Sequence, residues 1–476
     1  MDNNKKYRCS VYNIPVELED EANKTLLIHG YTGAMDIASE AITECLTYGQ
    51  EYDISNFPLS EETFKALIAR GYLTDRSEEE EYEYVRRFSN IFNRCEQAGK
   101  KGFTFMMAYN CNFRCPYCYE TEISRKGRQW SSKVFTKEMI DRAYQAMEEI
   151  EPNRDNIHNT ITLYGGEPLM ATNKDIITYT VEKGKSKGYS FHAVTNGYDL
   201  DNFLDLLAPD KIQTLQITVD GEKEYHDKRR THHIYGKSFD KIMNNINEAL
   251  KTGVRITVRA NTDGHNFDSM QRLKQVFRER GFYNFKTFYF YTALLCDPRN
   301  KMKKQSEGKD EERERHNHID YLSREKMVEK LKKEKFPFAM QNNGIYNKIY
   351  NALVTSSKIR FNAIFCCSQS NSYILDPYGE IYTCWDTVGK RERVLGNYLN
   401  SIVWNKKELE HWHTRNISTI SKCKECKYAL FCGGGCMGLV LNNDEDFTSN
   451  ICDGYPTIFK IYAALAYKNY SKEQTK

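Results

Sequence analysis

The segment Cys111-Asn112-Phe113-Arg114-Cys115-Pro116-Tyr117-Cys118 decides how the rest of the chain is interpreted. Its three cysteines have the spacing CxxxCxxC, and Tyr117 stands just before the last of them. Three thiolates on one short loop are one ligand short of the four that a [4Fe–4S] cluster takes. One iron would therefore be open to another molecule, as at a catalytic metal site. The alternative is a zinc site with a remote fourth ligand, which the extra cysteine ahead of the CxxC pair disfavours.

Two compact apolar runs flank this loop and predict buried strands. Residues 102–107 precede it, and residues 160–164 follow it and end in Gly165-Gly166-Glu167-Pro168. A strand, a CxxxCxxC loop and a second strand ending in GGEP resemble the radical S-adenosylmethionine (SAM) enzymes. The resemblance implies that the three cysteines hold a [4Fe–4S] cluster whose open iron binds the amine and carboxylate of SAM. One electron from the cluster would then break SAM into methionine and a 5′-deoxyadenosyl radical.

The same resemblance assigns contacts to SAM. It places Tyr117 near the adenine, and Gly165, Gly166 and Glu167 at the amino group. Glycines let a backbone approach a ligand closely, and a carboxylate suits an ammonium. A lone Gly-Gly-Glu is usually only a turn, so its weight comes from its place after the next strand.

Three further residues are candidate contacts to SAM. Thr195 and Asn196 begin a Thr-Asn-Gly sequence after a predicted strand and could reach the ribose or the carboxylate. The alternative is that this sequence is only a turn. Arg259 lies late on a predicted strand and is a candidate partner for the SAM carboxylate.

Composition excludes several other classes of protein. The chain has 476 residues and a net charge of +3 from charges of both signs, which is not a nucleic-acid footprint. Mean hydropathy is −0.70, no apolar run reaches membrane-spanning length, and the first residues lead into no signal core. We therefore predict a soluble cytoplasmic protein. In such a chain, fifteen cysteines indicate metal rather than disulfides.

The pattern after residue 102 alternates strands and helices, which predicts βαβ units and a parallel sheet. Two of the expected helices span residues 238–251 and 267–280. The resemblance implies a partial (β/α)6 TIM-like barrel, an α/β fold with its site at the C-terminal strand ends. The six predicted strands lie near 102–107, 160–164, 190–195, 213–219, 254–260 and 285–291.

The chain is predicted to divide into five segments. The run from 301 to 318 is almost wholly charged, which is typical of a solvated loop. Helical segments are expected near 319–335 and 344–357. In order, the segments are a winged-helix-like peptide-recognition domain (1–98), the partial barrel (99–300), the charged loop with bridging helices (301–360), an iron–sulfur domain (361–455) and a C-terminal helix (456–476).

The first hundred residues carry a weaker pattern. Residues 7–14 and 25–30 predict short strands, and residues 35–47 predict a helix. A capping Ser60 and the acidic run from Glu78 start two more helices. This order resembles the winged-helix module that recognises leader peptides, where the leader adds as a strand along a sheet edge. A structural cap on the barrel is the alternative.

A second set of cysteines lies near the C-terminus. Alone, four of them could form a zinc ribbon. Behind a radical SAM core, the whole array resembles the SPASM extension, which binds two auxiliary [4Fe–4S] clusters. By resemblance, the cluster farther from SAM takes Cys423, Cys426, Cys432 and Cys452, and the nearer one takes Cys384, Cys436 and a ligand from the adjacent pair Cys366-Cys367.

The adjacent pair departs from the fully ligated pattern, which has two separated upstream cysteines. Neighbouring cysteines can hardly both reach different corners of one cluster without strain. We therefore predict one ligand from the pair, Cys367 in preference to Cys366, and an open iron that could bind a substrate thiolate. The alternatives are that both ligate, or that water or a remote residue fills the place.

The functional hypothesis is a radical SAM peptide maturase with SAM and three [4Fe–4S] clusters as cofactors. It would form a thioether crosslink of the sactipeptide or ranthipeptide kind in a ribosomally made precursor peptide, with flavodoxin or ferredoxin as electron donor. Carbon–carbon crosslinking, epimerisation and sulfatase maturation are alternatives within the family, and a zinc-binding or electron-transfer protein is the alternative outside it. Sulfatase-maturing enzymes have Asp directly after the cysteine that matches Cys384. Here Trp385 stands there, which leaves Asp386 as a candidate base.

Overall fold

A computed structural model describes residues 5–18, 21, 23–47, 49–118, 120, 128–295, 320, 326, 344–443, 446–452 and 454–474. The predicted charged loop at 301–318 and nearly all of the helix predicted at 319–335 lie outside these residues. The chain forms two compact units. The first contains residues 1–98, 342–370 and 412–476, and the second contains residues 99–341 and 371–411.

The second unit is built on a parallel sheet, as the strand–helix alternation predicts. All six predicted strands are present, and their order in the sheet is their order in the chain. This sequential parallel order confirms the partial barrel. The strands are β7 (Gly102–Ala108), β8 (Thr160–Gly165), β9 (Ser190–Thr195), β10 (Ile212–Thr218), β11 (Arg255–Thr262) and β12 (Phe288–Leu294).

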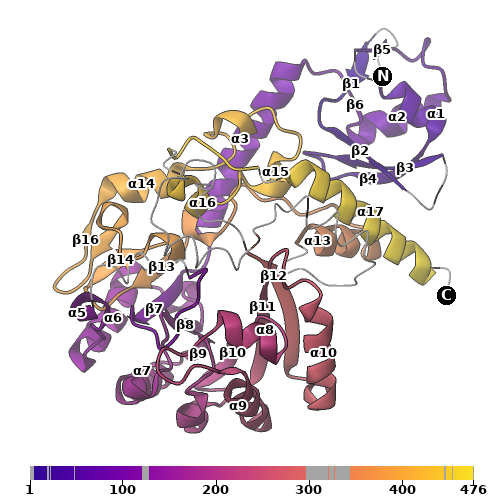
Figure 1. The fold of residues 1–476 in the computed structure, drawn as a ribbon. Coiled ribbons are helices and arrows are strands. Elements are labelled where there is room, and N and C mark those ends of the chain that lie inside the picture. The colour runs from indigo at the N-terminus through magenta and orange to yellow at the C-terminus, as the bar shows by residue number, and fades with distance from the viewer. Residues whose placement is uncertain are drawn as a thin grey trace, which may run out of the picture. The chain divides into compact units, whose positions relative to one another are not determined.

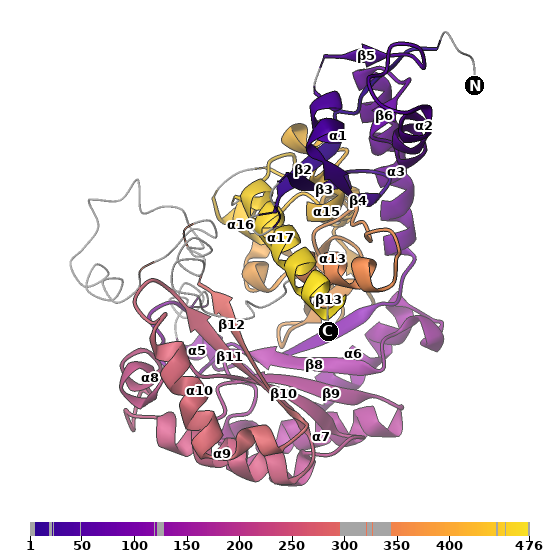
Figure 2. The ribbon, with the colours of Figure 1, turned by 90° about the vertical axis from the view of Figure 1, so that its right-hand side faces the viewer.

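Helices cover one side of this sheet, where α7, α9 and α10 lie side by side with the strands (Figures 1 and 2). The predicted helices at 238–251 and 267–280 are confirmed as α9 (Phe239–Lys251) and α10 (Ser269–Glu279). Helix α9 forms because Ile242, Ile246 and Ala249 recur at helical spacing on its buried face. The other crossover elements are α5 (Arg128–Ser131), α6 (Lys137–Ile150), α7 (Lys174–Ser186), the 3₁₀ helix η3 (Leu200–Leu206) and α8 (Lys223–Arg229).

Four short strands extend the same sheet beyond β7. Strand β13 (Ser372–Leu375) pairs with β7 in parallel, and β14 (Glu380–Tyr382), β15 (Gly396–Asn397) and β16 (Val403–Trp404) follow antiparallel. Strands β13 and β14 form a hairpin whose turn lies at Asp376–Glu380. The Asp376 carboxylate accepts from the backbone amides of Tyr378 and Glu380 at 2.9 and 2.8 Å. Cys384 follows β14, so this cysteine belongs to the second unit.

The N-terminal part of the first unit has two small antiparallel sheets. One contains β2 (Asn13–Glu17), β3 (Lys24–His29) and β4 (Met35–Ser39), and the other contains β1 (Tyr7–Cys9), β5 (Glu51–Tyr52) and β6 (Leu73–Thr74). Three helices alternate with the later strands. They are α1 (Glu40–Cys45), α2 (Glu61–Arg70) and α3 (Glu78–Gln97).

The helix predicted at 35–47 is wrong in its first five residues. These form β4, because their backbone pairs with β3 in register from Lys24–Ser39 to Ile28–Met35. The helix starts at Glu40, where the Ser39 side chain accepts from the amide of Ile42. The strand predicted at 7–14 is interrupted, with β1 ending at Cys9 and β2 starting at Asn13.

The N-terminal sheet of the first unit shares one core with the C-terminal part of the chain. Ile14 and Leu26 pack in a cluster with Tyr428, Phe431 and Phe459. A second cluster joins residues of the first hundred to the cysteine-rich segment in the same way. The helices that belong wholly to this part of the first unit are α13 (Gly344–Val354), α15 (Ala429–Cys432), α16 (Met437–Asn442) and α17 (Tyr455–Gln474), whereas α14 (Lys406–Thr414) begins in the second unit and ends in the first.

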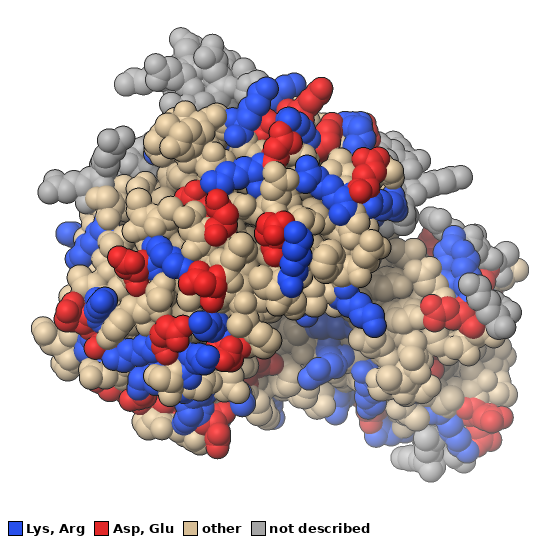
Figure 3. Space-filling model, turned by 90° about the horizontal axis from the view of Figure 1, so that it is seen from below, with Lys and Arg blue, Asp and Glu red and all other residues tan. Residues whose placement is uncertain are grey.

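The distribution of charge and the apolar length of the helices agree with the composition of the sequence. Lysine and arginine side chains are interspersed with acidic ones over the face shown in Figure 3. Within the described residues, the search for a helix long and apolar enough to span a bilayer finds none.

Candidate active site

The CxxxCxxC loop starts where β7 ends and is held by backbone contacts. The Arg114 amide donates to the Thr231 carbonyl at 3.0 Å, and the His233 amide donates to the Asn112 carbonyl at 2.9 Å. The side chain of His232 is buried, and its ring lies 4.5 Å from that of Tyr198 because the segment packs onto the cysteine loop.

The thiols of this loop resist ionisation in the protein alone. Burial raises the pKa of Cys111 well above its usual value, and the charges of Glu167 and Cys115 raise it further. Burial also raises the pKa of Cys115, which Arg230 opposes. Among the described residues, no three His, Cys, Asp or Glu side chains converge as on a single metal ion. Each iron of a [4Fe–4S] cluster takes one cysteine and keeps the thiol ionised, so the loop fits a cluster.

The Gly165-Gly166-Glu167 turn packs directly against the start of the cysteine loop. The Gly166 amide donates to the Ala108 carbonyl at 2.9 Å, and the Glu167 amide donates to the Asn110 carbonyl at 3.0 Å. A Cβ on Gly165, which has a φ of +148°, would overlap the Ala108 carbonyl, and one on Gly166 would overlap the Asn110 carbonyl. The glycines therefore let β8 approach the chain that leads to Cys111, in addition to any approach to a ligand.

Glu167 is a buried carboxylate without a cation. Its side chain is 1% exposed. One oxygen accepts from the Thr195 hydroxyl at 2.6 Å and the Leu169 amide at 2.9 Å, and the other accepts from the Asn196 amide at 2.6 Å. Burial raises the pKa of Glu167 to about 7, and no lysine or arginine among the described residues is a cause of its shift. A buried carboxylate in this state fits the ammonium group of SAM.

The pKa of Glu167 makes a prediction for the protein without cofactors. Because the folded-state pKa of about 7 lies above the usual value of 4.5, the native state binds more protons than the unfolded state between these values. The free energy of unfolding should therefore fall as the pH rises through this window. We expect Glu167→Gln to remove this dependence, so that the variant gains up to about 3 kcal/mol relative to wild type from pH 4.5 to 7.5. Urea unfolding across this range measures it, and parallel curves for the two proteins would contradict it.

Thr195 and Asn196 form hydrogen bonds within the protein. Besides their contacts to Glu167, the Asn196 side-chain amide donates to the Asn112 side-chain oxygen at 2.7 Å. They thus join the end of β9 to both the GGE turn and the cysteine loop. Arg259 lies on β11 and donates from Nε to the side-chain oxygen of Asn261 at 3.0 Å. Contacts of these three side chains to SAM stay a prediction.

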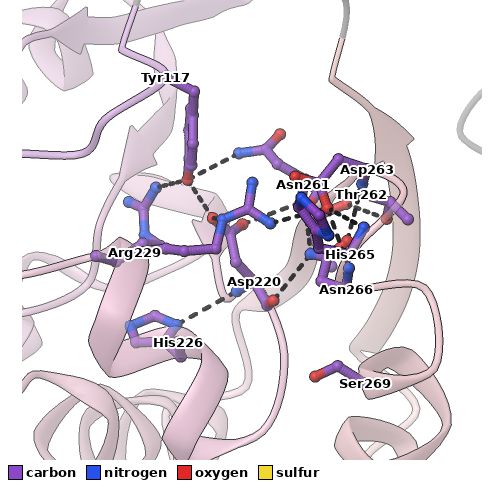
Figure 4. A network of polar contacts seen from close by, with 12 residues as sticks. Tyr117, Asp220, His226, Arg229, Asn261, Thr262, Asp263, His265, Asn266 and Ser269 are labelled. Atoms are coloured by element: carbon purple, nitrogen blue, oxygen red, sulfur yellow. Dashed lines mark hydrogen bonds and ion pairs between the residues drawn. The ribbon is translucent and has the colours of Figure 1, made fainter. Parts of the chain in front are cut away.

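Tyr117 ends in a buried polar network (Figure 4). Its hydroxyl donates to the carboxylate of Asp220 and accepts from Arg230 at 2.7 Å. The other oxygen of Asp220 accepts from the Asn261 amide at 3.0 Å. Arg229 is 2% exposed and has its two carboxylates, on Asp220 and Asp263, at 3.9 and 3.4 Å. The sequence analysis did not single out Arg230 or Asn261, because only the fold brings them to Tyr117.

Asp386 lies in the short 3₁₀ helix Trp385–Thr387 of the second unit. The ring of the preceding Trp385 lies 4.1 Å from that of Tyr164, which is two residues before Gly166 on β8. Burial raises the pKa of Asp386, and Lys390 opposes the rise. The residue therefore belongs to the barrel part of the chain, and its role as a base stays a prediction.

Three consecutive glycines lie between Cys432 and Cys436 in the first unit. Gly433, Gly434 and Gly435 all have positive φ. A Cβ on Gly433 would overlap the Ile364 carbonyl, and one on Gly435 would lie 2.7 Å from the Ile451 carbonyl. The glycines next to Cys432 and Cys436 thus pack against the segments that lead to Cys366 and Cys452. Three consecutive glycines in the sequence could have indicated that the chain packs closely against other segments at this point.

The C-terminal cysteines raise one another's pKa values. Burial raises the pKa of Cys423, and the charges of Cys432, Cys426 and Cys452 raise it further. These are the four residues predicted for one auxiliary cluster. Burial raises the pKa of Cys366 to about 11, and Cys367 and Cys436 contribute. Both Cys366 and Cys367 are exposed, and which of the two ligates stays a prediction.

Comparison with known proteins gives the class of this site. Residues 106–279 match the model of the Radical SAM superfamily. The cysteine-type anaerobic sulfatase-maturating enzyme of Clostridium novyi (strain NT) is 23% identical over 381 residues, which cover 76% of this chain and 93% of that protein. Native anSMEcpe with bound AdoMet and Kp18Cys peptide has a TM-score of 0.52 at 14% identity, with 78% of this chain and 99% of that chain covered. Streptococcus suis SuiB bound to S-adenosylmethionine has a TM-score of 0.50 at 14% identity, with 94% and 99% covered.

The cysteine loop, the buried carboxylate and these matches define a radical SAM domain on a partial barrel. Residues 106–279 are similar to the Radical SAM superfamily, the curated relatives include a sulfatase-maturating enzyme, and these similarities indicate that the protein is an enzyme. The cofactors of this class are SAM and an iron–sulfur cluster.

Proposed function

We propose that this enzyme forms a thioether crosslink in a ribosomally made precursor peptide. The observation that carries this choice is the residue after Cys384. Trp385 occupies the place where sulfatase-maturing enzymes have Asp, and its ring packs on Tyr164 near the GGE turn. A solved structure of similar fold holds a peptide together with AdoMet, which supports a peptide substrate.

The residues of the barrel have separate tasks in this proposal. Cys111, Cys115 and Cys118 hold the cluster, and Glu167 accepts the SAM ammonium. Thr195 and Asn196 fix that carboxylate, and the Tyr117 network fixes the far end of the loop. When bound, the cluster and SAM supply a 5′-deoxyadenosyl radical that takes a hydrogen atom from a substrate carbon.

In the proposed reaction, the substrate carbon loses a hydrogen atom to the deoxyadenosyl group, and the cysteine thiol loses its proton to solvent. A carbon–sulfur bond forms, and one electron leaves to an oxidant. The C-terminal cysteines are proposed to hold two auxiliary [4Fe–4S] clusters that take up this electron. A flavodoxin or ferredoxin is proposed as the donor of the electron that cleaves SAM.

The N-terminal sheets are proposed to bind the leader of the peptide. In the sheet β2–β3–β4, strands β2 and β4 are edge strands with one partner each. Ile37 on β4 is 39% exposed, so an apolar side chain is present at that edge. An extended leader could add to such an edge through backbone hydrogen bonds.

Mass spectrometry of the product tests the proposed reaction. The peptide to use is a cysteine-containing precursor encoded beside this gene, incubated with SAM and reductant. We expect a product lighter by two hydrogen atoms per crosslink, with the cysteine sulfur retained and resistant to alkylation. Glu167→Ala is the matched control, because it keeps all cysteines and should yield no product.

Formylglycine formation is the second candidate, since a relative is a cysteine-type anaerobic sulfatase-maturating enzyme. That reaction removes the cysteine sulfur and leaves an aldehyde, which a hydrazide reagent would capture. An aldehyde product, or a product that kept all its thiols free, would overturn the thioether proposal.

A further inference from the structure

Arg415 in the first unit is a buried cation without a carboxylate. Its side chain is 1% exposed. Its guanidinium donates to the carbonyls of Gly434, Gly435 and Ser449 at 3.2, 3.3 and 2.9 Å, and its Nε has no partner. No Asp or Glu of the described residues forms an ion pair with it or contributes to its pKa shift.

The groups around this guanidinium belong to the cysteine segments. Gly434 and Gly435 lie between Cys432 and Cys436, and Ser449 lies three residues before Cys452. The backbone carbonyl of Arg415 accepts from the side-chain amide of Gln369 at 2.8 Å, two residues after Cys367. One residue thus ties together three separate stretches that carry cysteines.

The buried positive charge of Arg415 indicates that the cysteine thiols are its counter-charge. A single ion buried in a protein is costly unless an opposite charge lies near it. Burial lowers the pKa of Arg415, and the charges of Cys423, Cys436, Cys366 and Cys432 oppose this. Hydrogen bonds to neutral carbonyls do not cancel the positive charge of Arg415. Among the described residues, the groups of negative charge that act on Arg415 are these cysteines. They carry negative charge when they ligate metal.

We propose that Arg415 is the shared counter-charge of the two auxiliary clusters and makes both easier to reduce. This rests on the auxiliary clusters of the proposed function. The four cysteines divide between the two predicted sets, Cys366 and Cys436 in one and Cys423 and Cys432 in the other. Arg415 touches no substrate and is a positioning residue that acts through the clusters.

The sign of the effect follows from Coulomb's law. Reduction of a cluster adds one negative charge to a site that already carries thiolates. A nearby fixed cation stabilises the reduced state more than the oxidised state. Its removal should therefore lower the equilibrium constant of one-electron reduction of each auxiliary cluster by roughly tenfold or more, about 59 mV per factor of ten.

The test uses the full chain with Cys111, Cys115 and Cys118 replaced by Ala, so that only auxiliary clusters remain. In this background Arg415→Met removes the charge, and Arg415→Lys keeps the charge but loses the planar fork. Redox titrations followed by electron paramagnetic resonance give the potentials, and iron and sulfide analyses count the clusters. Arg70→Met is the matched control, because that arginine of the same unit pairs with Asp36 at 2.7 Å.

We expect lower potentials for both auxiliary clusters in Arg415→Met, and values near the parent in Arg415→Lys and Arg70→Met. Clusters that form in the lysine variant but not in the methionine variant would also support a role of the charge. Unchanged potentials in Arg415→Met, or equal loss in both Arg415 variants, would overturn the inference and leave only a bracing role. A parent protein without auxiliary iron would instead overturn the auxiliary clusters of the proposed function, and the inference with them.

Discussion

Replacement of Cys111, Cys115 and Cys118 by Ala is expected to abolish the reductive cleavage of SAM. The loop supplies all three thiolates of the proposed SAM cluster, and no other cysteine of the second unit except Cys384 lies among its described residues. Without a cluster, no electron can reach the sulfonium. The measurement is the yield of 5′-deoxyadenosine with dithionite and SAM, which should fall below detection.

The proposed auxiliary clusters provide the control for this variant. Seven of the C-terminal cysteines belong to the first unit and the loop belongs to the second, so the proposed clusters on those cysteines should survive. Iron and sulfide content should fall by one cluster of three. Continued formation of 5′-deoxyadenosine by the triple variant would show that the active site has been assigned to the wrong cysteines.

Deletion of residues 1–98 is expected to destroy the proposed auxiliary clusters, and not merely to weaken the proposed peptide binding. The deletion would expose Tyr428, Phe431 and Phe459, which pack on the N-terminal strands in one core. Burial of each such side chain contributes about 1.5–3 kcal/mol, and the loss of several is comparable to the whole stability of a domain.

Iron analysis and circular dichroism of the truncated protein measure this effect. Ile37→Lys is a better probe of leader binding, because it alters an exposed position on β4 and leaves the shared core intact. It should weaken binding of the precursor in fluorescence anisotropy while the clusters remain. A truncated protein with full auxiliary iron would show that the C-terminal segment folds without the N-terminal sheets.

Much of the fold and of the site follows from local sequence. The cysteines at 111, 115 and 118 are close in the chain, so their spacing alone predicts a shared cluster. The strands of the barrel are predicted because each is a short apolar run between two helical segments. An apolar run of that length in that position usually forms a buried strand. The caps at Ser60 and Ser77 also depend on neighbours within one turn.

The long-range features were decided only by the tertiary structure. Met35–Ser39 became a strand because β3 offered backbone partners, which local propensity does not register. Strand β13 joined β7 from a distance of more than 260 residues. The state of a buried charge depends in the same way on what surrounds it. Among the described residues, none pairs Glu167 with a cation or Arg415 with a carboxylate, and this becomes visible only when distant segments close around each group and remove water from it.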